Sequence, residues 1–260
     1  MKALTYISIT LYALTSLVYL AYIFAPHDKL RRAGRFAISG VLMVHLATIG
    51  SYCLNGFHPL LGVGGTLNLI AFLLLLGFLL VSLRWPLTGG GAVVLPLALA
   101  LVISGQITSR APPAAGLPAA LGKLHLTLVA MGVAALALAS AAAIVYLRQD
   151  LALRRNQLLA LDKSAPALTT LDSLSLRLTV VGFPLFLCAV CTGVLWSQQL
   201  GFGVRLEHLL SGVILLVYLV LLVTRITVGL RGRRAAWITL FGFGVTVVVL
   251  GIYIARRVLG

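Results

Sequence analysis

The sequence predicts an all-α fold, namely a polytopic bundle of about eight transmembrane helices with both termini outside the cytoplasm. Of the 260 residues, 61% are hydrophobic and only 10% are charged. The mean hydropathy is +1.10, so the chain has more apolar side chain than a water-soluble core can bury. The apolar segments are continuous rather than alternating, which indicates helices and not barrel strands.

Eight segments are long enough to cross roughly 30 Å of hydrocarbon at about 1.5 Å per residue. The first follows a positive residue and lacks a small-residue cleavage site, so we interpret it as a retained span. The fourth is the weakest, because it opens with glycines and contains Pro96. We expect one integral membrane domain over residues 1–260. The predicted spans are Ala3–Ala25, Phe36–Leu54, Thr66–Leu83, Gly90–Ile107, Leu124–Tyr146, Leu178–Ser197, Leu206–Thr224 and Ala235–Ala255.

Basic residues are distributed unequally between the two sides of this predicted bundle. Of the 20 Lys and Arg residues, 14 fall in the connections after the odd-numbered spans. The positive-inside rule therefore places both termini outside the cytoplasm, in a multi-pass protein of the inner (plasma) membrane. The lipid bilayer is the expected partner of the apolar surface. No basic-aromatic platform for nucleic acid is present, so we predict no nucleic-acid binding despite the net charge of +15.

The fifth connection, Leu147–Arg177, is the one long connection predicted on the cytoplasmic side. We expect it to continue the fifth helix, to break at Pro166 and then to form a short amphipathic piece on the membrane surface.

Two of the five histidines open predicted spans on the same side of the membrane. His125 begins the fifth span and His208 begins the seventh, and the two crossings between them return the chain to its starting side. Two imidazoles at one level on different helices can be axial ligands of a haem iron. We therefore predict His125 and His208 as candidate iron ligands of haem b. The alternative is that each interfacial imidazole only bonds a neighbouring carbonyl.

Four further polar residues are candidates for cofactor contact. In the segment RLEHLLSG, Arg205 can meet a haem propionate and Glu207 can orient the imidazole of His208. His45 lies near the middle of the second span, where an ionisable side chain indicates either function or a hydrogen bond between helices. His58 lies in the uncharged outer loop NGFHPLLGVGG.

The segment LDSLSLRLTVVGFPLFLCAVCTGVLW, residues 171–196, resembles the membrane core of the cytochrome c assembly protein family, which includes the CcsA, CcmC and HemX-like proteins. The resemblance continues through VYLVLLVTRITVGLRGRRAAWITLFGF, and upstream it includes the histidine-led fifth span and the loop around His58. It covers about residues 45–255. It implies that the protein binds or handles haem at the outer membrane face during cytochrome c biogenesis, with cytochrome c maturation proteins as candidate partners. His125 falls on the position of an external haem-ligating histidine of the family.

The chain departs from the family pattern just before the seventh span. The tryptophan-rich string expected there, which holds the haem edge in the family, is missing, and only Trp196 remains near it as a candidate for cofactor contact. The chain thus resembles a short, eight-span branch of the YpjD inner-membrane type, in which a histidine stands where His208 does. Three interpretations stay open: a haem-handling accessory protein, a haem-free structural or partner-binding subunit, and, more distantly, a small-molecule permease. Carboxylates are too scarce for general-base chemistry, so we predict no catalytic residue.

Overall fold

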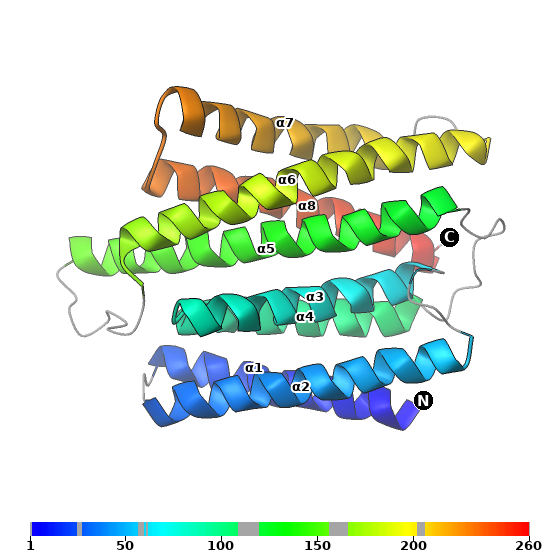
Figure 1. Cartoon of the computed structure of the whole chain (residues 1–260), viewed down its shortest axis with the longest axis horizontal. Coiled ribbons are helices and arrows are strands. Elements are labelled where there is room, and N and C mark those ends of the chain that lie inside the picture. Colours follow the sequence, from blue (N-terminus) through cyan, green and yellow to red (C-terminus); the bar gives the residue numbers. More distant parts are fainter. Residues whose placement is uncertain are drawn as a thin grey trace.

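A computed structural model describes residues 2–24, 28–56, 60, 62–108, 120–155, 166–201 and 206–259. Within them the regular structure is helical, and each of the eight main helices is long and apolar enough to cross a membrane. Figure 1 shows these helices running side by side along one direction. The predicted all-α, eight-span architecture is therefore confirmed. The helices are α1 (Lys2–Phe24), α2 (Asp28–Leu54), α3 (Val63–Arg84), α4 (Thr88–Thr108), α5 (Ala120–Arg154), α6 (Leu168–Gln199), α7 (Leu206–Thr227) and α8 (Arg233–Leu259).

Two helices begin well before the spans predicted for them. Helix α2 begins at Asp28 rather than Phe36, and α6 begins at Leu168 rather than Leu178. The expectation of a separate amphipathic piece after Pro166 was therefore wrong, because that segment forms the first turns of α6. Hydropathy marks only the part of a helix that lies in hydrocarbon, whereas the backbone hydrogen bonds continue through the polar flanks.

Helix α5 is the centre of the bundle. Within its most apolar 18 residues 72% are buried, compared with 22–50% for the other spans. Small residues allow this: a side chain at Gly132 would place its Cβ 2.9 Å from the backbone nitrogen of Phe186 on α6. The most extensive contact of α5 is with α6, and it also packs on α3 and α8. Close α5–α6 packing brings the start of α5 beside the end of α6.

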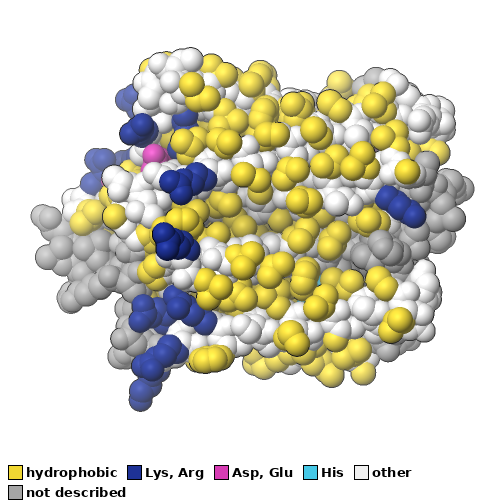
Figure 2. Space-filling model, in the orientation of Figure 1, with side chains coloured by type: hydrophobic (Ala, Val, Ile, Leu, Met, Phe, Trp, Pro, Cys, Tyr) yellow, Lys and Arg dark blue, Asp and Glu magenta, His cyan; other side chains and the backbone are white. Residues whose placement is uncertain are grey.

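The two ends of the bundle differ in charge. At one end, which we call the histidine end because it holds His125 and His208, α5 and α7 begin and α6 and α8 end. Helix α1 also begins there (Figure 1). Lys and Arg side chains gather at the opposite, basic end, and an apolar flank separates the two (Figure 2). The described basic residues of that end are Lys29, Arg31, Arg32, Arg35, Arg84, Arg148, Arg154, Arg155, Arg177, Arg225, Arg231, Arg233 and Arg234.

Candidate functional site

His125 is held in place by a backbone carbonyl of the neighbouring helix. It lies in the second turn of α5, and its Nδ1 is 2.7 Å from the carbonyl oxygen of Ala189 on α6. A carbonyl oxygen can only accept, so Nδ1 carries the proton and donates it. In the neutral imidazole Nε2 then keeps its lone pair, which is the arrangement seen in metal-ligating histidines. The bond agrees with both interpretations of the sequence, a carbonyl-bonded imidazole and an iron ligand.

A glycine on α6 makes room for this imidazole. A Cβ built on Gly193 would lie 2.7 Å from Cε1 and 2.9 Å from Nδ1 of His125. Ala189 and Gly193 are four residues apart and so lie on the same face of α6. Ala189 supplies the hydrogen-bond acceptor for the imidazole, and Gly193 supplies the space for its ring. These two positions were not among the residues predicted for the site.

Trp196 completes the α6 side of the site. Its ring centroid is 5.9 Å from that of His125, with the two planes tilted by 41°. The indole Nε1 is buried and has no hydrogen-bond partner, and the same is true of the hydroxyl of the next residue, Ser197. Buried polar groups are normally paired, so the unpaired indole N–H next to the imidazole indicates a place for a further polar partner.

Helices α7 and α8 place further polar residues at the histidine end. His208 lies half-buried in the first turn of α7, at the same end of the bundle as His125. Glu207 uses one carboxylate oxygen, Oε1, to accept a hydrogen bond from Nη1 of Arg256 on α8 at 2.7 Å. Its other oxygen, Oε2, is buried without a partner. The partner found for Glu207 is thus Arg256, which the sequence did not single out, and an orienting role of Glu207 towards His208 stays a prediction.

The structure places four of the predicted residues at the histidine end, namely His125, Trp196, Glu207 and His208, and the rings of His125 and Trp196 are in contact. It does not describe Arg205 or His58, which lie outside the described residues. Arg256 was missed because it is one of several arginines near helix ends, and a single sequence does not say which of them meets the one acid of that end.

His45 has a different environment. It is buried on α2, where its Nδ1 is 2.8 Å from the hydroxyl of Tyr12 on α1, and its ring packs edge-on against Phe72 of α3. Ser8 and Thr48 form a second α1–α2 hydrogen bond, at 2.9 Å. These contacts match the interhelical hydrogen bond considered for His45. A role of His45 in cofactor contact stays a prediction.

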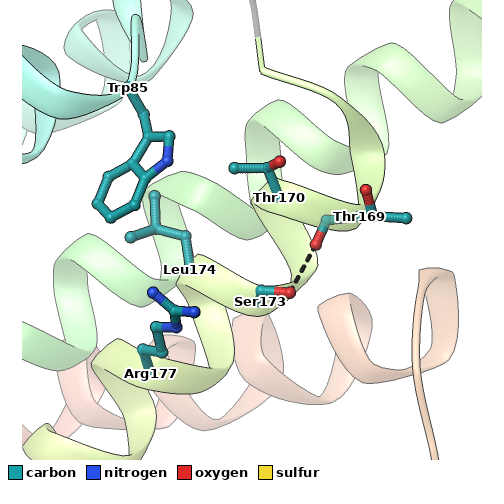
Figure 3. A pocket seen from close by; sticks show the side chains of 6 residues that line it. All are labelled: Trp85, Thr169, Thr170, Ser173, Leu174 and Arg177. Atoms are coloured by element: carbon teal, nitrogen blue, oxygen red, sulfur yellow. Dashed lines mark hydrogen bonds between the residues drawn. The ribbon is translucent and has the colours of Figure 1, made fainter.

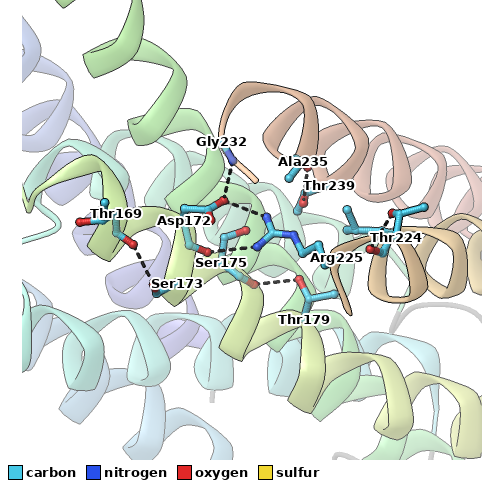
Figure 4. Close-up of polar contacts among 11 residues, drawn as sticks. Thr169, Asp172, Ser173, Ser175, Thr179, Thr224, Arg225, Gly232, Ala235 and Thr239 are labelled. Atoms are coloured by element: carbon cyan, nitrogen blue, oxygen red, sulfur yellow. Dashed lines mark hydrogen bonds and ion pairs between the residues drawn. The ribbon is translucent and has the colours of Figure 1, made fainter. Parts of the chain in front are cut away.

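A second polar cluster lies at the basic end (Figure 4). The carboxylate Oδ1 of Asp172 on α6 accepts from Nη2 of Arg225 on α7 at 3.1 Å and from the backbone nitrogen of Gly232 at 3.2 Å. The Arg225 side chain is 3% exposed. Gly232 has a φ of 71°, a conformation that glycine adopts without strain. Asp172 therefore ties α6, α7 and the α7–α8 turn together.

Eight apolar spans with a polar, histidine-containing end define a polytopic helical membrane protein. The chain matches the family described as Cytochrome C assembly protein over residues 60–259, from just before α3 to the last residue of α8. It belongs to that family, as the resemblance in its sequence indicated, and its role therefore lies in cytochrome c biogenesis. Searches of curated proteins and of solved structures found no match.

Proposed function

We propose that this protein binds haem b at its histidine end and handles it during cytochrome c biogenesis. The observation that carries the proposal is the arrangement around His125. Nδ1 of His125 donates its hydrogen bond to the carbonyl of Ala189, so the lone pair of Nε2 remains available to bind iron. His208 opens α7 at the same end of the bundle, which makes it the candidate for the second ligand.

The neighbouring groups suit the rest of a haem. The indole of Trp196 offers an aromatic surface next to His125, and its unpaired N–H can donate to a carboxylate. Arg256 is exposed enough to exchange part of its contact with Glu207 for a propionate. Haem, when bound, supplies the iron chemistry, while the residues of the chain hold it, orient it and limit its access to water.

The basic end, in this proposal, faces the cytoplasm. An excess of basic residues at one end fixes topology in the plasma membrane by the positive-inside rule. The haem site is then on the outer face, where cytochrome c maturation proteins are the candidate partners. We propose no catalytic residue, because the described site offers a single carboxylate that is already engaged by Arg256.

Haem titration of the purified protein tests this proposal. We expect a Soret band whose intensity saturates with added haem b, and an affinity that falls at least about tenfold in His125→Ala and in His208→Ala, as for loss of a metal ligand or its support. The control is His27→Ala, because His27 lies in the connection after the first span, on the predicted cytoplasmic side. A spectrum that does not change in either His125→Ala or His208→Ala would refute the site. Co-purification of a partner that survives both substitutions would support the haem-free subunit instead.

A further inference from the structure

A cleft opens at the basic end, far along α6 from the histidine end (Figure 3). Its volume is about 260 Å³, and it lies between the first three turns of α6 and Trp85, the residue that follows α3. The lining residues are Trp85, Thr169, Thr170, Ser173, Leu174 and Arg177.

The lining is polar and positively charged. Thr169, Ser173 and Arg177 are spaced by four residues and so share one face of α6. Ser173 donates its hydroxyl proton to the carbonyl of Thr169 at 2.8 Å, which leaves its oxygen as an acceptor only. Arg177 is the one charged residue of the lining. The nearest acid along α6, Asp172, is bound to Arg225 and does not line the cleft.

The start of α6 adds to the positive potential of the cleft. Helix α6 has Ala167 at its N-cap, and no side chain there accepts a hydrogen bond from the first turn. The unpaired backbone N–H groups of a first turn carry partial positive charge. Together with the guanidinium of Arg177, they favour an anion with several acceptor oxygens, which is the chemistry of a phosphate group.

An exposed apolar surface of α6 continues from the cleft towards the middle of the helix. Val180 and Val181, three and four residues after Arg177, are 49% and 57% exposed. Leu187, further along α6, is also exposed. A cationic, hydroxyl-lined cleft that continues into an exposed apolar helix face matches a molecule with a phosphate head and hydrocarbon chains better than it matches a free anion.

We infer that this cleft binds the phosphate of an anionic phospholipid, with Arg177 and the hydroxyls of Thr169 and Thr170 at the phosphate and the acyl chains along Val180 and Val181. Trp85, on the other side of the cleft, is a residue type that prefers the level of lipid headgroups. This site is at the opposite end from the proposed haem site and is independent of it.

Native mass spectrometry of the detergent-purified protein tests the inference, by titration with phosphatidylglycerol or phosphatidylcholine of the same acyl chains. We expect one phosphatidylglycerol to bind about tenfold more tightly than phosphatidylcholine, as for one added charge-assisted contact. Arg177→Gln should remove that preference. Ser173→Leu, which fills the cleft from an exposed position without changing its charge, should do the same. The matched control is Arg234→Gln, an exposed arginine of the same end that does not line the cleft.

Two results would contradict the assignment of a lipid to this cleft. If Arg177→Gln and Ser173→Leu both retain the wild-type preference, the cleft is not the lipid site. Inorganic phosphate alone, added at the same concentration as the lipid, should displace little phosphatidylglycerol. If it displaces the lipid fully, the site is one for free anions and the assignment to a lipid fails. The haem spectrum of Arg177→Gln should equal that of the wild type, so this result does not depend on the proposed haem site.

Discussion

At the residue scale, the position of the His125 side chain depends on Gly193. The imidazole fits against α6 only because position 193 has no side chain, and the same fit brings Nδ1 to the carbonyl of Ala189. An alanine at 193 would overlap the ring edge at 2.7 Å from Cε1. Since Gly193 lies within a helix, its small size and not its backbone freedom explains its presence.

Substitution of Gly193 by alanine should therefore displace His125. We expect the haem affinity to fall at least about tenfold and the free energy of unfolding to decrease by about 1–3 kcal/mol, as for other overpacked sites. Haem titration and thermal unfolding in detergent measure the two effects. The control is Gly244→Ala on α8, where a Cβ would meet nothing within 4 Å. Equal behaviour of the two variants would show that Gly193 does not position the imidazole.

Buried polar contacts between helices determine how whole helices pack. Asp172 is a residue of α6, but its carboxylate determines how α7 and the α7–α8 turn meet α6. Arg225 is almost completely buried, and a buried charge without its counter-ion is strongly destabilising. The α1–α2 hairpin, which precedes the family match, is joined in a similar way by neutral contacts, Tyr12 with His45 and Ser8 with Thr48.

Asp172→Asn keeps the size of the side chain but removes the charge that Arg225 requires. We expect the free energy of unfolding to fall by about 3–5 kcal/mol, the usual cost of breaking a buried ion pair from one side. Asp150→Asn is the matched control, since its partner Arg154 is 61% exposed and lies one turn away on the same helix. Such a pair contributes about 0.3–0.5 kcal/mol. Denaturant titration of both variants provides the comparison, and similar losses in the two would contradict a structural role of Asp172.

The separation of charge along the bundle is a property of the whole molecule. The basic end carries nearly all the described Lys and Arg side chains, while Lys123 and Arg256 are described at the histidine end. The helices run between these ends without interruption (Figure 1). Once the orientation of the bundle in the membrane is known, the membrane face of each site is therefore known as well. The proposed haem site and the proposed lipid site must then lie on opposite faces.

Cysteine labelling tests that orientation. Cys53 is exposed in the last turn of α2, at the histidine end. In a variant with Cys188 and Cys191 changed to alanine, we expect a membrane-impermeant maleimide to label Cys53 in intact spheroplasts. A cysteine placed at Arg234, in a background without the native cysteines, should react only after the membrane is permeabilised. The opposite pattern would invert the proposed topology and move the haem site to the cytoplasmic face.

Much of the site could be predicted from the sequence, because the number of membrane crossings determines the end of the bundle at which a residue lies. Spans can be counted from hydropathy one residue at a time, and an even number of crossings places His125 and His208 at one end whatever the packing is. The family resemblance added Trp196. By contrast, the partner of Glu207 could not be predicted, since the choice of Arg256 depends on how α7 and α8 are rotated about their axes.

The sequence by itself determined the eight spans, the unequal distribution of basic residues between their two ends, and the family. The tertiary structure alone decided that α5 lies at the centre, that Ala189 and Gly193 fix His125, and that Asp172 holds Arg225. The physical reason is that transfer into a membrane is a sum over single residues, whereas helix contacts are set by the close fit of small residues on neighbouring helices. Which faces meet is therefore a property of all the helices together.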